Sequence, residues 1–271
     1  MTGKRNELMI ESKTARFRHK ALLLCLWLAS SAWAQTSLDP LTTKDIETDR
    51  PDVTPSTVPK GSLQVENGLA WTRDELSRAL DLTESLLRLG VSDSTEVRVG
   101  IPTYFNSIGH RPLESGFGDF LIGAKQRIAS VAGFDLAIVP ALSFPTGSKT
   151  RSSHGFDPQL EIPWEHELRG SWSLSGTLGI FYLTDGGRRR TLGENQIELE
   201  TKVTRRADLF LEYQSFLGDG AANNSLQMGG GYKLRPNHRL DCFLVAGLSR
   251  AAPNLAIAVG YSIRLDRLWA K

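Results

Sequence analysis

Four charged residues between positions 84 and 98 could form ion pairs inside a protein or line a pore. Glu84 and Arg88 lie in the segment TESLLRLGV, and Glu96 and Arg98 lie in STEVRVGI, with the tight turn SDS between them. Alternate residues of a strand point to the same face, so a hairpin over these segments would place all four charges on one side. Two hypotheses follow: a charged constriction that selects solutes, or a structural ladder of cross-strand ion pairs.

The motif ETDRPD places a second group of charges, Asp49, Arg50 and Asp52, ahead of these segments. It lies within residues 35–61, where prolines recur among Thr, Asp and Lys. Proline donates no backbone hydrogen bond and breaks helices, so we expect an extended arm. This arm is either a plug or gate inside the protein, or a cap that staples the first strand. As a plug it would pair with wall residues, for which the candidates are Arg88, Arg98, Arg127 and Glu96.

The histidines beyond residue 34 form no catalytic pattern. A hydrolase site needs a histidine close to a serine and an orienting carboxylate, and none of the four lies in such a cluster. The sequence has no H-x-x-x-H metal pattern and no nucleotide-binding loop, and no basic cluster interleaved with aromatic residues. We therefore expect no enzyme, no metal or other cofactor and no nucleic-acid partner. The four histidines are His110, His154, His166 and His238.

Segments of about ten residues alternate between apolar and polar positions along most of the chain, as β-strands do. Some joints between them are short, such as 92–94, and others are long, such as 102–117 and 184–195. Short turns at one end and long loops at the other are typical of an antiparallel up-and-down transmembrane β-barrel. We predict an all-β barrel of about 12 strands: 62–73, 83–91, 94–101, 118–128, 134–147, 158–168, 172–182, 196–203, 207–216, 225–234, 239–249 and 254–265.

Charged side chains fall on one face of these strands, whereas Leu, Val and Ile fall on the other. This alternation also fits an exported β-sandwich or a soluble barrel with its charges outside. A membrane barrel with its charges in the lumen is favoured, because a soluble barrel this wide would need more apolar bulk to fill it. Aromatic residues near strand ends suit interfacial girdles; they are Trp71, Tyr104, Phe105, Trp172, Tyr182, Phe216 and Trp269. The predicted lumen charges are Glu66, Glu84, Arg88, Glu96, Arg98, Asp119, Lys125, Arg127, Glu161, Glu198, Lys202, Asp208, Glu212, Lys233, Asp241 and Arg264.

The first 34 residues have the pattern of a secretory signal peptide. A basic stretch precedes the apolar run ALLLCLWLAS, and AWA predicts cleavage before Gln35. Cleavage would remove six of the 32 basic and two of the 30 acidic residues, which leaves 26 basic and 28 acidic residues and a formal net charge of −2. One cysteine, Cys242, would remain, so no internal disulfide is expected. The predicted organisation is a signal peptide (1–34), an arm or plug (35–61), a barrel (62–265) and a C-terminal tail (266–271).

The stretch ETDRPDVTPSTVPKGSLQVENGLAWTR (47–73) resembles the opening of an outer-membrane transporter family associated with the phenol meta-cleavage degradation pathway (MetA-pathway type). In that family a TDRPD box and a VPxGxxQxExG phrase lead into the first strand. The likeness extends over roughly residues 45–265. Further matches are LLRLGVSDSTEVRVGIP (86–102), GFGDFLIGAKQRI (116–128), PALSFPTG (140–147) and WSLSGTLGI (172–180).

The resemblance implies a small outer-membrane barrel that moves small organic compounds, aromatic ones among them. Movement would be passive, because no nucleotide-binding loop is present. The expected partners are outer-membrane lipid, a small-molecule solute and the barrel-assembly machinery, and the protein is expected to be a monomer. The alternative is a structural or partner-binding envelope barrel with a lumen sealed by its own ion pairs. The lumen or gate candidates are Asp49, Arg50, Asp52, Glu66, Glu84, Arg88, Glu96, Arg98 and Arg127.

Overall fold

A computed structural model describes residues 45–74, 77–109, 115–218, 220 and 222–268. The predicted signal peptide, the first ten residues of the arm, His110 and Trp269 lie outside the described residues. Within the described part, no helix is both long and apolar enough to cross a membrane.

Antiparallel strands account for most of the described chain, and they form one sheet. The strands are β1 (Leu63–Arg73), β2 (Ser77–Leu82), β3 (Ser85–Gly90), β4 (Thr95–Ile101), β5 (Tyr104–Gly109), β6 (Gly116–Phe117), β7 (Phe120–Val131), β8 (Phe134–Phe144), β9 (Asp157–Glu167), β10 (Trp172–Asp185), β11 (Arg188–Lys202), β12 (Ala207–Leu217), β13 (Asn223–Arg235), β14 (His238–Gly247) and β15 (Leu255–Leu265).

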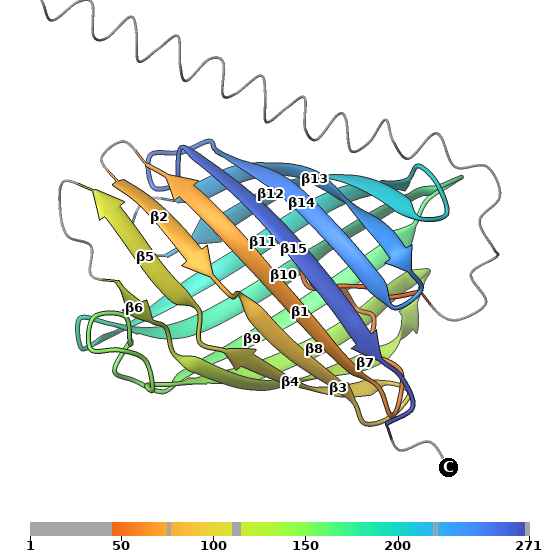
Figure 1. Cartoon of the computed structure of the whole chain (residues 1–271), viewed down its shortest axis with the longest axis horizontal. Coiled ribbons are helices and arrows are strands. Elements are labelled where there is room, and N and C mark those ends of the chain that lie inside the picture. Colours follow the sequence, from red (N-terminus) through yellow and green to blue (C-terminus); the bar gives the residue numbers. More distant parts are fainter. Residues whose placement is uncertain (1–44, 75–76, 110–114, 219, 221, 269–271) are drawn as a thin grey trace, which may run out of the picture. The chain divides into compact units, whose positions relative to one another are not determined.

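The sheet closes on itself because β1 pairs with β15 along its whole length (Figure 1). Three of the barrel strands are interrupted: β2 and β3 both pair with β1, β4 continues as β5, and β6 continues as β7. Counted in this way, the described strands form a closed 12-stranded antiparallel barrel. Closure leaves no free edge, so backbone groups pair all round the wall. The prediction of an up-and-down barrel of about 12 strands is confirmed.

Two segments predicted as long loops contain strands instead. Residues 102–117 contain β5 and β6, and residues 184–195 contain the end of β10 and the start of β11, joined at Gly186 and Gly187. Both glycines have positive φ angles, 55° and 77°, which glycine adopts without steric cost. In 184–195 the error arose because these ends of β10 and β11 are polar, so they lack the apolar alternation by which the other strands were recognised.

The interruptions have local causes. Between β2 and β3, Thr83 adopts a φ of 58°, which a β-branched residue tolerates poorly and which takes the chain out of extended conformation. Between β4 and β5 stands Pro102, which has no N–H to donate to a neighbouring strand. In β7 the register with β8 shifts between Arg127 and Ala129. This irregularity explains why the predicted alternation stopped at Ile128, three residues before β7 ends.

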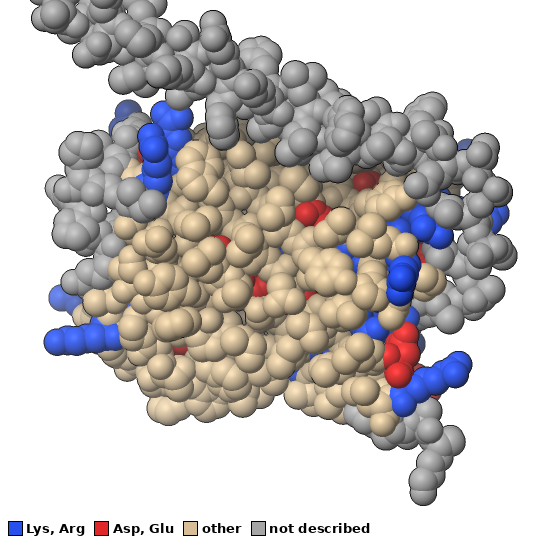
Figure 2. All heavy atoms as spheres, viewed as in Figure 1, with Lys and Arg blue, Asp and Glu red and all other residues tan. Residues whose placement is uncertain are grey.

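The two faces of the wall have opposite polarity, as predicted. Large apolar side chains are exposed on the outside, for example Leu178 (54 % exposed) and Leu211 (46 %). Figure 2 shows uncharged residues over most of the visible wall, with Lys and Arg at its two ends. Among the predicted girdle residues, Trp172 and Tyr182 lie toward opposite ends of β10 and are exposed. The interior holds the buried charged and polar side chains, including Gln64, Glu66, Arg88, Glu96, Arg98, Lys125, Glu198, Asp208, Glu212, Asp241 and Arg264.

Candidate functional site in the barrel lumen

The arm that precedes β1 is buried against the inner wall. Ile46 and Val58 are 0 % and 2 % exposed, and the N–H of Ile46 donates to the carbonyl of Pro236 between β13 and β14 at 2.7 Å. The N–H of Val58 donates to the carboxylate of Glu96 in β4 at 2.8 Å. An arm with contacts to strands on several sides of the barrel occupies the lumen, which supports the plug hypothesis.

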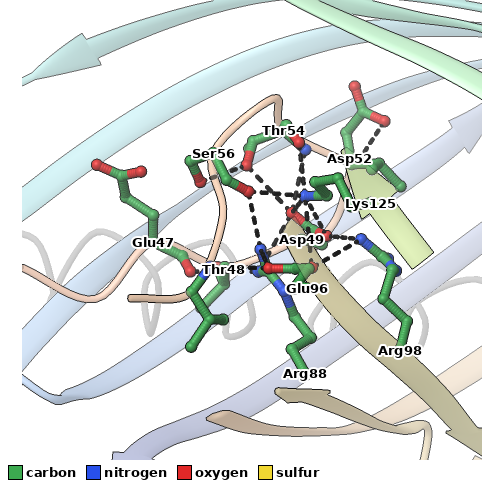
Figure 3. A network of polar contacts seen from close by, with 12 residues as sticks. Glu47, Thr48, Asp49, Asp52, Thr54, Ser56, Arg88, Glu96, Arg98 and Lys125 are labelled. Carbon is green, nitrogen blue, oxygen red and sulfur yellow. Dashed lines mark hydrogen bonds and ion pairs between the residues drawn. The ribbon is translucent and has the colours of Figure 1, made fainter. Parts of the chain in front are cut away.

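Three basic side chains from the wall converge on Asp49 of the arm (Figure 3). Lys125 of β7 lies 2.7 Å from the carboxylate, Arg88 of β3 lies 3.3 Å from it, and Arg98 of β4 is a third ion-pair partner. Two wall carboxylates complete the group: Glu66 bonds Arg88 at 2.8 Å, and Glu96 bonds Arg88 at 2.8 Å. We call these six residues the Asp49 cluster.

Backbone groups of the arm complete the hydrogen bonding of the Asp49 cluster. The Nζ of Lys125 donates to the carbonyls of Thr54 and Ser56 at 2.6 and 3.0 Å, and Arg88 donates to Ser56 at 3.0 Å. The carboxylate of Asp49 accepts from the N–H of Thr54 at 3.1 Å, which folds residues 49–54 into a compact turn. The same cations therefore bind both the side chain and the backbone of the arm.

The charges in the Asp49 cluster balance, with three carboxylates against two guanidinium groups and one ammonium group. Burial alone would raise the pKa of Asp49, but the positive charges of Arg88, Lys125 and Arg98 outweigh it and lower that pKa below its ordinary value. A buried ionic network is stable only when each charge keeps its partners. Removal of the arm would therefore leave three buried cations facing two carboxylates.

Arg50 is held at the seam where the barrel closes. Gly68 of β1 and Gly260 of β15 are cross-strand partners, and Arg50 lies over both. A Cβ at Gly68 would come within 2.1 Å of the Arg50 guanidinium, and one at Gly260 within 2.7 Å. From this slot Arg50 reaches Glu84 at 3.0 Å and Asp241 at 3.4 Å. The two glycines are thus required for the close approach of the arm to the wall.

Asp52 points to the other side of the lumen. Its carboxylate accepts a hydrogen bond from the hydroxyl of Thr177 in β10 at 3.1 Å and from the N–H of Val53 at 2.6 Å. Burial, together with the nearby carboxylates of Asp49 and Glu161, raises the pKa of Asp52 to about 7. The motif ETDRPD thus places one carboxylate among cations and the next among acids.

Eight of the nine lumen or gate candidates belong to the Asp49 cluster or to the contacts of Arg50 and Asp52 described above. Arg127 does not: it is exposed, and it donates to the backbone carbonyl of Asp93 at the β3–β4 turn at 3.3 Å. Lys125 was placed on the lumen face but was not among the gate candidates, because only the three-dimensional register brings it to Asp49. Glu194 was missed because it fell in a predicted loop, although Glu194, Gln196 and Glu198 continue the alternation of β11.

Little free space separates the arm from the wall beside it. A space of about 10 Å³ lies between arm residues 45–59 and the inner side of β1 and β15. This volume suffices for about one water molecule. The arm residues that line this space therefore lie close against β1 and β15.

The comparisons with known proteins agree with this barrel. A family model described as "Putative MetA-pathway of phenol degradation" matches residues 48–265, from the arm to the end of β15. The chain belongs to this family. The family resemblance read from the sequence is confirmed, and the match includes the TDRPD motif that carries Asp49, Arg50 and Asp52. Among curated proteins no sequence match is found.

Solved structures with similar folds are outer-membrane channels and porins. A crystal structure of an outer-membrane channel from Pseudomonas putida F1 superposes with a TM-score of 0.60 at 15 % identity, over 81 % of this chain and 100 % of that chain. The NanC porin gives 0.54 at 8 % identity, over 75 % and 100 % of the two chains, and the KdgM porin gives 0.52 at 8 % identity, over 74 % and 98 %. At these identities the likeness concerns the fold, which is that of outer-membrane β-barrels.

Proposed function

We propose that the protein is a passive outer-membrane channel for small organic compounds, aromatic compounds among them, and that its arm closes the lumen. The barrel fold, its apolar outer wall and its charged interior support a membrane-spanning channel. The family description supports a solute connected with phenol degradation. The proposal includes no catalytic role, and the barrel itself would serve as a monomer in outer-membrane lipid after insertion by the barrel-assembly machinery.

The observation that carries the gating part of the proposal is the position of Asp49. A residue ahead of the first strand joins cations from β3, β4 and β7, and its side chain is fully buried. The contacts of the arm are ionic and hydrogen-bonded, and water can replace such contacts. An arm held in this way is suited to leave and re-enter the lumen, with Asp49 as the residue that secures the closed state.

A sealed structural barrel is the second candidate, and the depth of burial favours it. Arg88, Lys125, Glu66 and Glu96 are all 0 % exposed, so the Asp49 cluster is packed as tightly as a protein core. If the arm never leaves, the barrel would act through its outer surface or its loops. The two candidates differ in one measurable property, which is conductance.

Planar-bilayer recording of the mature chain distinguishes them. We compare the complete chain with a deletion of residues 35–61, which removes the arm, and with a deletion of residues 35–44, which retains every described residue of the arm. Current steps that become larger or more frequent only in the first deletion support a gated channel. No current from any of the three proteins, each shown by heat-modifiable gel migration to be folded, would contradict the channel and favour the sealed barrel.

A further inference from the structure

Four glutamates on the inner wall lack the cationic partners that the Asp49 cluster has. They lie on three strands: Glu161 on β9, Glu194 and Glu198 on β11, and Glu212 on β12. Within the described part of the chain, none of them forms an ion pair with Lys or Arg. We call these four residues the acidic wall. Asp52 of the arm adds a fifth carboxylate beside it.

Strand register brings the acidic wall together. Glu198 and Glu212 are directly opposite each other on β11 and β12. Glu161 and Glu194 are each paired with Gly179 of β10, from its two sides, and a Cβ on Gly179 would come within 2.7 Å of the Glu194 carboxylate. Like charges at directly opposite positions destabilise a sheet. This spacing therefore has a structural cost unless a positive charge offsets it.

The groups that do bond the acidic wall are neutral. Gln196 donates to Glu194 at 3.0 Å, Gln227 donates to Glu212 at 2.9 Å, and the hydroxyl of Ser175 donates to Glu198 at 3.4 Å. The nearest cations that act on Glu161 are Arg98 and Lys125. Both belong to the Asp49 cluster, where carboxylates already balance them. Among the described residues, the chain thus supplies no cation that would balance these four carboxyl groups when they are ionised.

Three buried oxygen atoms at the acidic wall have no hydrogen-bond partner among the described residues: Oε2 of Glu194, Oε2 of Glu212 and Oε1 of Gln196. Gln196 is 4 % exposed and Glu212 is 0 % exposed. Gln196 lies between Glu194 and Glu198 on the lumen face of β11. All three atoms are acceptors, and an unsatisfied buried acceptor is costly. A ligand that donates hydrogen bonds would satisfy these atoms, and a ligand that also carries positive charge would offset the glutamates when they are ionised.

An aromatic pair lies next to the acidic wall. Phe210 and Phe243 have ring centroids 6.3 Å apart, and Phe210 precedes Glu212 by two residues on the same face of β12. The guanidinium of Arg50 already lies 5.9 Å from the centre of the Phe243 ring. Cations are attracted to the faces of aromatic rings, and Arg50 shows that a nitrogen cation is accommodated in this part of the lumen.

We propose that the acidic wall is a binding and selectivity site for organic cations with N–H donors, that is, protonated amines. This inference rests on the proposed function only for the step of permeation, because binding to the wall does not require an open channel. Carboxylates attract the cation, Gln196 orients its N–H groups, and anions are repelled. The uncharged analogue of the same size lacks the charge and is not retained.

Calorimetric binding of butylammonium to the full mature chain in a non-ionic detergent tests the proposal. Tetramethylammonium, which has charge but no N–H, and 1-butanol, which has a donor but no charge, are the comparison probes. The test variant is Glu198→Gln/Glu212→Gln, which keeps shape and hydrogen bonding and removes the opposed pair of charges. Glu167→Gln is the matched control, because Glu167 is an exposed residue at the end of β9.

Butylammonium should bind the parent and Glu167→Gln equally, and about tenfold more weakly to the double variant, as expected when hydrogen bonds to charged groups are lost. Tetramethylammonium should bind more weakly than butylammonium, and 1-butanol should not bind. Equal binding by the double variant, or no binding by the parent, would overturn the proposal.

Reversal potentials in a KCl gradient provide the second measurement. The parent should be cation-selective, and the selectivity should fall in Glu198→Gln/Glu212→Gln but not in Glu167→Gln. Anion selectivity of the parent would overturn the proposal. An absence of current with butylammonium binding intact would contradict the channel function but not the amine site, so the two failures are distinguishable.

Discussion

Asp49 and Lys125 are 76 positions apart in the sequence, and the carboxylate of one lies 2.7 Å from the ammonium group of the other. Asp49 belongs to the arm, and Lys125 belongs to β7 on the wall. Both side chains are 0 % exposed. This contact holds the arm inside the barrel. The charge of Asp49 therefore contributes to the stability of the wall.

Asp49→Asn should destabilise the closed protein. The substitution leaves Arg88, Arg98 and Lys125 buried with one carboxylate fewer, and loss of one partner from a buried ionic group typically costs about 3–5 kcal/mol. We expect a lower midpoint in urea unfolding followed by gel migration. Asp93→Asn, at the exposed turn between β3 and β4, is the control and should leave the midpoint unchanged. Equal midpoints for all three proteins would show that the Asp49 cluster contributes nothing to stability.

In Gly68→Ala the arm should be held less tightly in the lumen, while the barrel remains folded. The new methyl group would lie 2.1 Å from the Arg50 guanidinium, and the end of that flexible side chain would move rather than the strand. We expect faster proteinase K cleavage within residues 45–61, with unchanged heat-modifiable migration of the barrel. Gly193→Ala is the matched control, because its Cβ would meet nothing closer than 3.6 Å. Similar cleavage of both variants would argue against the Arg50 slot.

The polarity of the wall gives a position-dependent prediction for charges on the outer face. Leu211 lies in the middle of β12 and Leu217 lies at its end, and both are exposed. In a membrane barrel, Leu211→Arg should cost about 2–4 kcal/mol and Leu217→Arg about 0–1 kcal/mol. Urea titration of the protein folded into lipid vesicles measures both. Two equal and small effects would be the behaviour of a barrel whose outer face meets water.

Much of the fold could be predicted because its signal is local. Alternation of apolar and charged residues gave all 12 barrel strands and placed Glu66, Arg88 and Lys125 on the inner face. The same signal fails at the polar ends of β10 and β11, which extend beyond the apolar belt, so the residues from 184 to 195 were misassigned as a loop. The alternation also carries no information on which inward residues meet across the lumen.

The candidate site shows this limit most clearly. The TDRPD motif identified Asp49, Arg50 and Asp52 as plug candidates, and the structure places all three against the inner wall, with the two aspartates buried. Their individual partners depend on long-range register: Asp49 meets β7, and Asp52 meets Thr177 of β10. The two aspartates are only three positions apart, and this spacing does not predict which of them meets cations and which meets acids.

Those different environments give the arm a predicted dependence on pH through Asp52. The pKa of this carboxyl is raised from 3.8 to about 7 when the arm lies in the lumen. Between these two pH values Asp52 therefore holds a proton in the seated arm and loses it when the arm is released. The acidic groups that act on Asp52 are Asp49 in the arm, Glu161 on β9, Glu194 and Glu198 on β11, and Glu212 on β12. Seating should therefore be tightest at low pH, weaken as the pH rises toward about 7, and stay constant above it.

Hydrogen-exchange protection factors for the amides of residues 45–61 measure this dependence, because they are corrected for the intrinsic effect of pH on exchange. We expect higher protection at pH 5 than at pH 8. Asp52→Asn keeps a neutral side chain at both values, so the difference should become smaller in that variant while the protection at pH 5 is retained. Protection that increases with pH in the parent, or a dependence that persists in full in Asp52→Asn, would show that a group other than Asp52 controls the seating of the arm.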